Sequence, residues 1–306
     1  MSETTEPTFE TTLRLPFEVD LRLVLGPLWH GPRDPSMRLG HLGFARAAHT
    51  PGGPATVSVT RRGSGEFGVQ AWGAGAAIAV DGLADLLGAA DEPAALVPHH
   101  RLIGELVRRL PGLRMTRSRA AFEALLFAIV GQRVTGLESS NSHRSVVRRY
   151  GQPAPGPLAL TLPPTPAELA RQPYWAFHGL GIERRRADVI RHAAAAAPAF
   201  ERALKSGAEV TRQRLTSIHG IGPWTAAETI RLALGDPDAV SFGDYHVPNL
   251  VSWALSGEAR GSDERMLELL EPYEGQRARV VLLLELSGLQ PPRFGPRMAP
   301  RSIAAI

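Results

Sequence analysis

The spacing of hydrophobic residues changes once along the chain, close to residue 98. From Thr8 to Leu15 apolar and polar residues alternate, which is the period of a half-buried β-strand. Gly- and Pro-rich turns separate the apolar runs that follow. We expect further strands at 41–47, 56–62 and 66–72, and short helices at 19–28 and 83–87. Residues 1–98 are therefore predicted to form a small α+β domain.

After Pro93 the apolar residues recur every three or four positions, as on one face of an α-helix. One such stripe covers residues 102–110 and a second covers residues 122–130. The pattern predicts an all-helical region over residues 99–290, followed by a Pro- and Arg-rich tail at 291–306. The predicted fold class is mainly α, with a helical core and a smaller N-terminal α+β domain.

Composition limits the possible classes of protein. The chain has 306 residues, of which 43% are hydrophobic and 21% are charged, as in globular proteins large enough for two domains. It contains no apolar run long enough for a membrane span, and its acidic start does not resemble a signal peptide. We therefore expect a cytoplasmic protein without a membrane partner. The absence of Cys excludes disulfides, Cys-ligated zinc and an iron–sulfur cluster, and the His residues show no metal-binding spacing.

Almost all of the positive charge is carried by Arg, because Lys205 is the only Lys. The formal net charge of +4 by itself fits an ordinary Arg-rich protein. The Arg residues cluster in the predicted helical half, at 108–109, 114–119, 144–149 and 184–186. Basic clusters attract phosphates, so this distribution favours a nucleic acid as partner.

The most informative stretch is the turn Gly220-Ile221-Gly222-Pro223 between two predicted helices. Gly at two positions lets the backbone turn tightly and approach a ligand without a Cβ in the way. Pro223 has a φ that suits a first helical turn, where its missing N–H is not needed. The N–H groups that open the second helix have no intrahelical partner, so they form an anion site. This pattern predicts a backbone phosphate of a nucleic acid as the ligand.

A longer pattern contains this turn. The run Gly-Ile-Gly-Pro-Trp-Thr-Ala from Gly220 to Ala226, with Asp244-Tyr245 about twenty residues further on, resembles the helix-hairpin-helix motif of the HhH-GPD superfamily of DNA glycosylases. The closest resemblance is to the bacterial alkyladenine branch, the 3-methyladenine DNA glycosylase II type.

The resemblance implies a base-excision repair enzyme. Such an enzyme hydrolyses the N-glycosidic bond of alkylated purines, for example 3-methyladenine and 7-methylguanine, after they are flipped out of duplex DNA. The resemblance also implies a monomer whose partner is double-stranded DNA, and therefore association with the nucleoid.

Asp244 matches the catalytic carboxylate of the family. Its role there is to stabilise the positive charge that develops on the sugar as the base departs, and to help orient the attacking water. The residues alone also support a plainer interpretation, because Asp244 precedes Val247-Pro248 as a good helix N-cap would. The two roles are compatible, since a capping carboxylate can face a cleft.

Trp224 stands where bifunctional members of the family carry a Lys nucleophile. Schiff-base lyase chemistry then lacks its nucleophile, so the resemblance implies a monofunctional glycosylase. Trp224 and Tyr245 would offer aromatic faces to a cationic alkylated purine, a contact worth about 0.5–2 kcal/mol. Glu228, in place of an aromatic residue, and His246 are also assigned to the base pocket.

Other residues are assigned to DNA by their position in the motif. Gln132-Arg133 follows an apolar helix where the branch has a Gln and an apolar wedge that fills the gap left by the flipped base. Arg133 departs from that pattern, and a plain polar helix end is the alternative interpretation. The hairpin N–H groups expected to bind phosphate are those of Gly220, Ile221, Gly222, Trp224 and Thr225.

One ion is implied by the resemblance. In the family the hairpin carbonyls hold a monovalent cation, Na⁺ or K⁺, and the matching positions here are Thr216, Ile218 and Ile221. No other cofactor is expected.

Two alternatives remain open from the sequence. The lesion could be another damaged base, such as ethenoadenine, hypoxanthine or uracil, because pocket shape decides the choice. The second alternative is a non-catalytic protein that uses the hairpin only as a phosphate clamp. Asp244 argues against a clamp, because a carboxylate facing DNA would weaken it.

Overall fold

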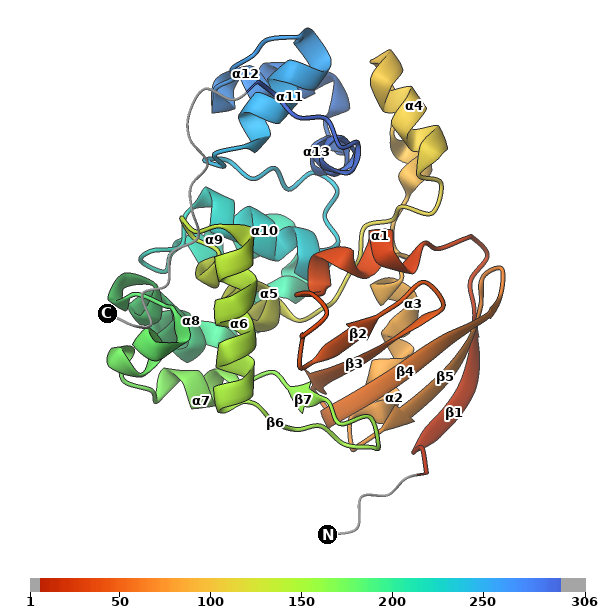
Figure 1. The fold of residues 1–306 in the computed structure, drawn as a ribbon, viewed down its shortest axis with the longest axis vertical. Helices are drawn as coiled ribbons and strands as arrows, with labels where there is room; N and C mark the ends of the chain where they lie inside the picture. Colours follow the sequence, from red (N-terminus) through yellow and green to blue (C-terminus); the bar gives the residue numbers. More distant parts are fainter. Residues whose placement is uncertain (1–5, 293–306) are drawn as a thin grey trace.

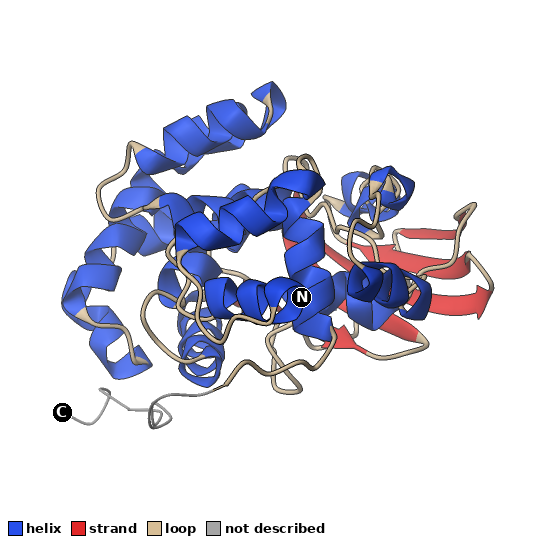
Figure 2. Cartoon of the chain, turned by 90° about the horizontal axis from the view of Figure 1, so that it is seen from above, coloured by secondary structure: helices blue, strands red, loops and turns tan. Residues whose placement is uncertain are grey.

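The computed structural model describes residues 6–292, and residues 1–5 and 293–306 lie outside this range. All but the first two positions of the predicted tail, 291–306, therefore lie outside the described residues. Figure 1 shows a β-sheet beside a group of helices, with a second group of helices at one end of the molecule. Figure 2 shows from above that the strands gather on one side of the helices.

The N-terminal part contains a five-stranded antiparallel sheet with strand order β1-β5-β4-β3-β2. The strands are β1 (Phe9–Arg14), β2 (Met37–Leu39), β3 (Gly43–Thr50), β4 (Gly53–Gly63) and β5 (Glu66–Trp72). The helices here are α1 (Leu21–Leu25), α2 (Ala76–Asp81) and α3 (Leu83–Leu86), with 3-10 turns η1 (Gly26–Leu28) and η2 (Pro93–Ala95).

Two elements of this part were not predicted. β2 has only three residues, too few for an alternating pattern to stand out. α2 has the sequence Ala-Ala-Ile-Ala-Val-Asp, in which apolar residues are continuous and show no helical period. α2 packs against β3, β4 and β5, so tertiary burial explains its composition.

The remainder of the chain is helical apart from a two-stranded ribbon of β6 (Gln152–Pro153) and β7 (Thr161–Leu162). The helices are α4 (Arg101–Arg109), α5 (Ala121–Val130), α6 (Gly136–Tyr150), α7 (Pro166–Ala170), α8 (Arg184–Ala203), α9 (Ala208–Thr216), α10 (Pro223–Leu234), α11 (Val247–Ser256), α12 (Asp263–Leu270) and α13 (Arg277–Leu286). Three 3-10 turns lie among them, η3 (Tyr174–Leu180), η4 (Leu204–Ser206) and η5 (Glu271–Tyr273). The predicted fold class, mainly α with a smaller N-terminal α+β part, is confirmed.

Two large hydrophobic cores organise these elements. The first joins the sheet to α5, α8 and α10, and includes the fully buried Phe67, Leu125 and Ile230. The second is formed by α4, α11, α12 and α13, which lie together in Figure 1 although α4 is far from the others in sequence. Because the first core contains residues from both sides of position 98, the domain division at 1–98 and 99–290 stays a prediction.

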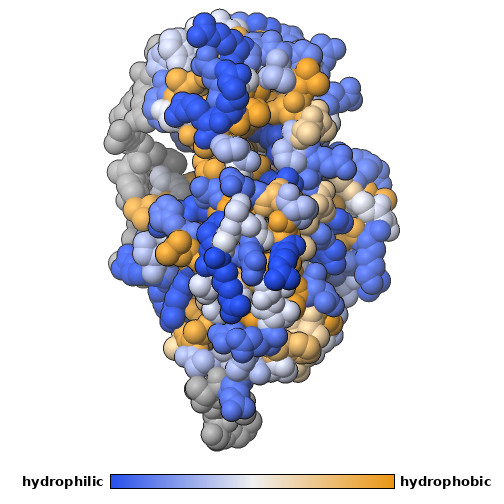
Figure 3. All heavy atoms as spheres, turned by 90° about the vertical axis from the view of Figure 1, so that its right-hand side faces the viewer, coloured by the Kyte–Doolittle hydropathy of each residue, from blue (hydrophilic) through white to orange (hydrophobic). Residues whose placement is uncertain are grey.

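The outer surface is ordinary. On the face drawn in Figure 3, hydrophilic residues are mixed with smaller hydrophobic areas, as on most proteins in water. Within residues 6–292, no helix combines the length and the apolar character that crossing a bilayer requires.

Candidate active site

The predicted hairpin joins α9 to α10. Two backbone hydrogen bonds close the turn, from the Ile218 N–H to the Leu215 carbonyl (3.1 Å) and from the Ile221 N–H to the Ile218 carbonyl (3.0 Å). Ile221 is buried in the first core and anchors the turn. α10 begins at Pro223 after Gly222, and no side chain caps it. No side chain occupies the N–H groups of this helix end, and the anion site there stays a prediction.

The two glycines of the hairpin have different roles. Gly220 has a φ of 90°, and a Cβ at this position would overlap the side chain of Val189 on α8. Gly222 has a φ of −97°, and no atom lies within 4 Å of a Cβ placed there. Gly220 is thus required by the fold, whereas Gly222 leaves open space in front of α10.

Gln132 holds the hairpin from the end of α5. Its side-chain Nε2 donates hydrogen bonds to the Gly220 carbonyl (3.0 Å) and to the hydroxyl of the buried Thr225 (2.9 Å). Its amide N–H groups are therefore used within the protein. Gln132 therefore positions the hairpin, and its direct contact with DNA stays a prediction.

Arg133 extends from the same loop in a different way. Its side chain is exposed and makes no hydrogen bond or ion pair within residues 6–292. Its backbone has a φ of 56°, an unfavourable conformation for a residue with a Cβ. The prediction that Arg133 contacts DNA is compatible with this position.

Asp244 lies between the hairpin and α11, and both of its carboxylate oxygens are hydrogen-bonded. Oδ1 accepts the backbone N–H groups of His246 (2.7 Å) and Val247 (2.9 Å), which is the predicted capping role. Oδ2 accepts the indole Nε1–H of Trp224 at 2.9 Å. The cap and the indole together hold the carboxylate in one orientation, beside α10.

A pocket of about 140 Å³ opens next to this pair. An apolar cavity of about 150 Å³ can hold benzene, so the volume of the pocket is close to that of one aromatic ring. Its lining comes from α10, α13 and the loop between α10 and α11, at the junction of the two cores: Trp224, Glu228, Arg231, Ala239, Val240, Ser241, Asp244, Val247, Ala278, Val281, Leu282 and Glu285.

Two of the four residues assigned to the base pocket line it, and two do not. Trp224 and Glu228 are in the lining. Tyr245 is 82% exposed, and its ring lies edge to face against the ring of His246 with the centroids 5.0 Å apart. Tyr245 and His246 are both exposed and do not line this cavity, so their contact with a base stays a prediction.

The sequence was compared with known proteins, and no family model matches it. One segment of 126 residues is 31% identical to DNA-3-methyladenine glycosylase 2 of Escherichia coli K12. This segment covers 40% of the chain and 45% of the Escherichia coli protein, so the match spans less than half the length of that relative.

Similarity of fold extends over most of the chain. A 3-methyladenine DNA glycosylase from Archaeoglobus fulgidus has a TM-score of 0.75 at 21% identity, over 90% of this chain and 97% of that one. An 8-oxoguanine glycosylase/lyase from Clostridium acetobutylicum, in complex with double-stranded DNA, has a TM-score of 0.69 at 13% identity, over 91% of this chain and 94% of that one. This chain has the helix-hairpin-helix DNA glycosylase fold. The predicted resemblance to the superfamily and to its 3-methyladenine branch is confirmed.

Within this glycosylase fold, the pocket contains three polar residues that the sequence pattern did not single out, namely Arg231, Ser241 and Glu285. Glu228 accepts hydrogen bonds on both carboxylate oxygens, from Arg231 (2.6 Å) and from the hydroxyl of Ser241. Glu285 reaches the same pocket from α13. The only available signal was the position of Arg231 three residues after Glu228 on one helix. Nothing in the local sequence relates Ser241 or Glu285 to the motif.

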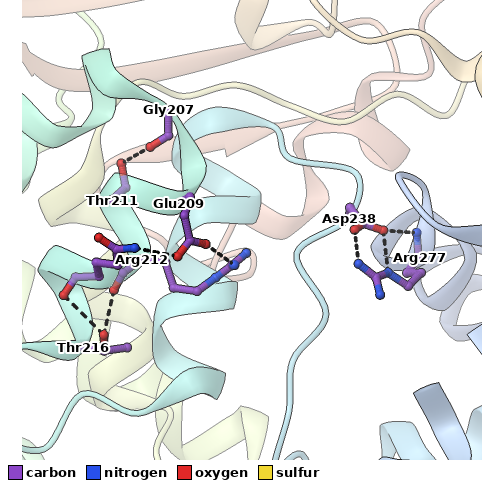
Figure 4. A network of polar contacts seen from close by, with 8 residues as sticks. Gly207, Glu209, Thr211, Arg212, Thr216, Asp238 and Arg277 are labelled. Carbon is purple, nitrogen blue, oxygen red and sulfur yellow. Dashed lines mark hydrogen bonds and ion pairs between the residues drawn. The ribbon is translucent and has the colours of Figure 1, made fainter. Parts of the chain in front are cut away.

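The loop that carries Asp244 is fixed to α13 by an ion pair. Asp238 accepts hydrogen bonds from the Arg277 side chain (Nε at 2.8 Å, and Nη2) and from the Arg277 backbone N–H at 3.0 Å. Figure 4 shows this pair joining the loop to the first turn of α13. The Arg279 N–H donates to the Pro237 carbonyl at 3.0 Å beside it. These contacts fix the spacing of the pocket walls.

Other basic residues have distinct positions in the glycosylase fold. Arg186, in the predicted basic cluster 184–186, is buried and donates to the Val130 carbonyl at 2.7 Å, so its guanidinium supports the end of α5. Arg185 is exposed. Lys205 lies on η4 and borders a different cavity, between the sheet and the helices. The only Lys is therefore absent from the Asp244 pocket.

The hairpin offers carbonyl groups of the predicted cation site. Thr216 ends α9, and its hydroxyl donates to the carbonyls of Arg212 (2.9 Å) and Gln213 (3.3 Å), as Figure 4 illustrates. The Ile218 carbonyl accepts one hydrogen bond within the turn, and a carbonyl oxygen has a second lone pair. Among residues 6–292, no group of three or more His, Asp or Glu side chains is arranged to hold a metal ion. Any ion at the hairpin would therefore use main-chain oxygens.

Proposed function

We propose that this chain is a monofunctional DNA glycosylase that hydrolyses the N-glycosidic bond of alkylated purines in duplex DNA. The observation that carries the proposal is the hydrogen bond between Trp224 and Asp244 beside a pocket whose volume is close to that of one aromatic ring. The names of the similar proteins from Escherichia coli and Archaeoglobus fulgidus support 3-methyladenine as a substrate. Release of 7-methylguanine and extrusion of the base from the duplex are parts of the same proposal.

Asp244 supplies the negative charge that this reaction needs. Positive charge develops on the sugar as the C1′–N bond breaks, and a preorganised carboxylate stabilises it without reorganisation. The Trp224 indole and the α11 cap hold the Asp244 oxygens in place before the reaction begins. An N3- or N7-alkylated purine already carries a positive charge and is a good leaving group, and the indole face adds a cation–π contact of about 0.5–2 kcal/mol.

The absence of lyase activity rests on the position of Trp224 and on the location of Lys205 outside the pocket. A Schiff base with C1′ needs an amine at the site. Borohydride treatment during turnover should therefore trap no covalent enzyme–DNA adduct. Any trapped adduct would contradict this part of the proposal. The Lys205→Arg variant would then show whether Lys205 is the nucleophile, because the adduct would disappear in that variant only if it is.

Duplex DNA is the proposed partner, bound by a monomer. The uncapped start of α10 would bind one phosphate, and the exposed Arg133 would contact the strand. Binding should then weaken steeply with salt and favour a duplex over a single strand. Light scattering of the protein, free and bound to a short duplex, tests the monomeric state.

We also propose a monovalent cation at the hairpin, held by the carbonyls of Thr216, Ile218 and Ile221. Such an ion would bring positive charge to the turn that faces the phosphate. DNA affinity should be lower in tetramethylammonium chloride than in KCl at equal ionic strength. Equal affinity in the two salts would contradict a cation requirement.

The decisive test is base release from methylated duplex DNA by wild type and by Asp244→Asn. We expect wild type to release 3-methyladenine, 7-methylguanine or both, and Asp244→Asn to retain DNA binding with release reduced about 100-fold or more. Wild-type protein that binds DNA and releases no base of any kind would instead support the non-catalytic clamp.

A further inference from the structure

The walls of the base pocket contain two carboxyl groups besides Asp244, and their surroundings differ. Glu228 has an acceptor bond on each oxygen, one from Arg231 and one from Ser241. The Arg231 guanidinium and the Ser241 hydroxyl therefore hold the Glu228 side chain in the wall, with both of its oxygens already used as acceptors.

The third carboxyl group of the pocket belongs to Glu285. It makes no hydrogen bond or close ion pair among residues 6–292, although it lines the same cavity. Glu285 as a residue is exposed to solvent, but the protein packed around its carboxyl group still removes water from that group. This desolvation raises the pKa of Glu285 to about 7, and the negative charges of Glu228 and Asp244 add to the rise, against the lowering effect of Arg231.

The charged groups that act on Glu285 come from α10 and from the loop before α11. α11 itself, which packs against α13, carries no ionisable side chain. The other charges on elements packed against α13 lie outside the pocket lining: Arg101, Glu105, Arg108 and Arg109 on α4, and Glu271 on η5. A base entering the pocket would displace more water from Glu285 and favour its neutral form further.

We propose that Glu285 is a general acid of the pocket, which donates a proton to the departing base and thereby extends the substrates to neutral damaged purines such as hypoxanthine and ethenoadenine. The inference rests on the proposed function and concerns the same site. It divides the work between two carboxyl groups, with Asp244 acting on the sugar and Glu285 acting on the base. Enzymes often assign acid and charge-stabilising roles to carboxyl groups in contrasting environments.

In the proposed step, breaking of the glycosidic bond is coupled to proton transfer from Glu285 to the base. The C1′–N bond breaks and its electron pair goes to the base. The Glu285 carboxyl proton passes to an acceptor atom of the base, so the base leaves neutral and Glu285 becomes a carboxylate. Water then bonds to C1′ and releases a proton to solvent, from which Glu285 is protonated again. A cationic alkylated purine leaves neutral without the transferred proton, so it depends less on Glu285.

The test compares two substrate classes under single-turnover conditions with the full chain. Duplexes contain either hypoxanthine, a neutral base, or 7-methylguanine, a cationic base. We expect Glu285→Gln to lower hypoxanthine release by about 100-fold or more, the usual contribution of a general acid, and to lower 7-methylguanine release at least ten times less. Glu271→Gln, an exposed Glu outside the pocket, is the matched control and should leave both rates unchanged.

The pH profile of the wild type gives a measurement that does not depend on the folding of any variant. Hypoxanthine release should fall as pH rises through about 7, because the proton donor is lost, and 7-methylguanine release should not share this fall. Two results would overturn the inference and leave the proposed function standing. One is release of 7-methylguanine without release of hypoxanthine, and the other is an equal effect of Glu285→Gln on both bases. Release of neither base, nor of any other, would overturn the proposed function and the inference with it.

Discussion

The indole of Trp224 donates a hydrogen bond to the Asp244 carboxylate at 2.9 Å, from the second position of α10 to the loop that precedes α11. The same carboxylate caps α11 through its other oxygen. The hairpin helix and the pocket loop therefore meet at one carboxylate, which the Trp224 indole holds from the side of α10.

Replacing Trp224 with Phe tests this relationship. Phe keeps an aromatic face but cannot donate to Asp244, and a hydrogen bond to a charged group is worth about 1.5–3 kcal/mol. We expect base release to slow by about 10- to 100-fold with little change in DNA affinity. Trp253→Phe on α11, outside the pocket lining, is the control. A wild-type rate in Trp224→Phe would show that the hydrogen bond has no role in the reaction.

Substitutions of Asp244 should separate its two roles. Asn can accept the same capping hydrogen bonds, whereas Ala cannot, so we expect Asp244→Ala to lose about 1 kcal/mol of unfolding free energy and Asp244→Asn to lose less. Both variants should lose base release. Urea denaturation combined with single-turnover kinetics measures the two effects. Equal stability of the two variants would mean that the cap contributes little.

The hairpin glycines form a matched pair of test sites. Gly220→Ala introduces a Cβ that overlaps Val189 at a positive φ, so we expect a loss of about 1–3 kcal/mol in unfolding free energy. Gly222→Ala meets no atom of the protein and should unfold like wild type. It should weaken DNA binding, because its methyl group points into the space expected for the strand. Normal DNA affinity in Gly222→Ala would place the strand elsewhere.

Arg133 should show opposite effects on stability and on binding. Gly at this position removes the cost of a positive φ, so we expect Arg133→Gly to be more stable than wild type by about 1 kcal/mol. Loss of one phosphate contact should weaken DNA binding. It should also lower the slope of log affinity against log salt concentration by about one. Denaturation and DNA titrations at several KCl concentrations measure both quantities. An unchanged salt dependence would exclude a phosphate contact by Arg133.

Two buried histidines predict a loss of stability in mild acid. His143 is 2% exposed, and both of its ring nitrogens lack hydrogen-bond partners in the described structure. Burial lowers the pKa of His143 to about 4 and also lowers that of the adjacent His30. Between about pH 6.5 and pH 4 these rings take up a proton more readily in the unfolded chain than in the folded one. The unfolding free energy is therefore highest above about pH 6.5 and decreases as the pH falls towards 4.

The size of this loss of stability follows from the lowered pKa of His143. From pH 7 to pH 5, His143 alone should reduce the unfolding free energy by about 2 kcal/mol. Urea denaturation at the two pH values provides the measurement. A His143→Gln variant should lose part of this pH dependence, and an unchanged dependence would assign it to other groups.

Several features followed from short stretches of sequence. The hairpin depends on Gly220 and Pro223, whose backbone preferences are local. Asp244 was identified by its spacing from the hairpin, and its cap involves residues two and three positions away. The longer helices that were predicted, such as α4 and α5, have clear periodic patterns. The short β2 and the uniformly apolar α2 have none, so they escaped prediction.

The pocket required the tertiary structure, because its walls come from elements that sequence spacing does not relate. Glu285 meets Glu228 only because α13 packs within the second core while α10 belongs to the first. Tyr245 adjoins Asp244 in sequence, but it is 82% exposed and does not line the cavity, which its sequence position could not indicate. The sequence by itself determined the turn and the catalytic candidate through local backbone chemistry. The tertiary arrangement that brings α10 and α13 to one cavity decided which charged groups share it.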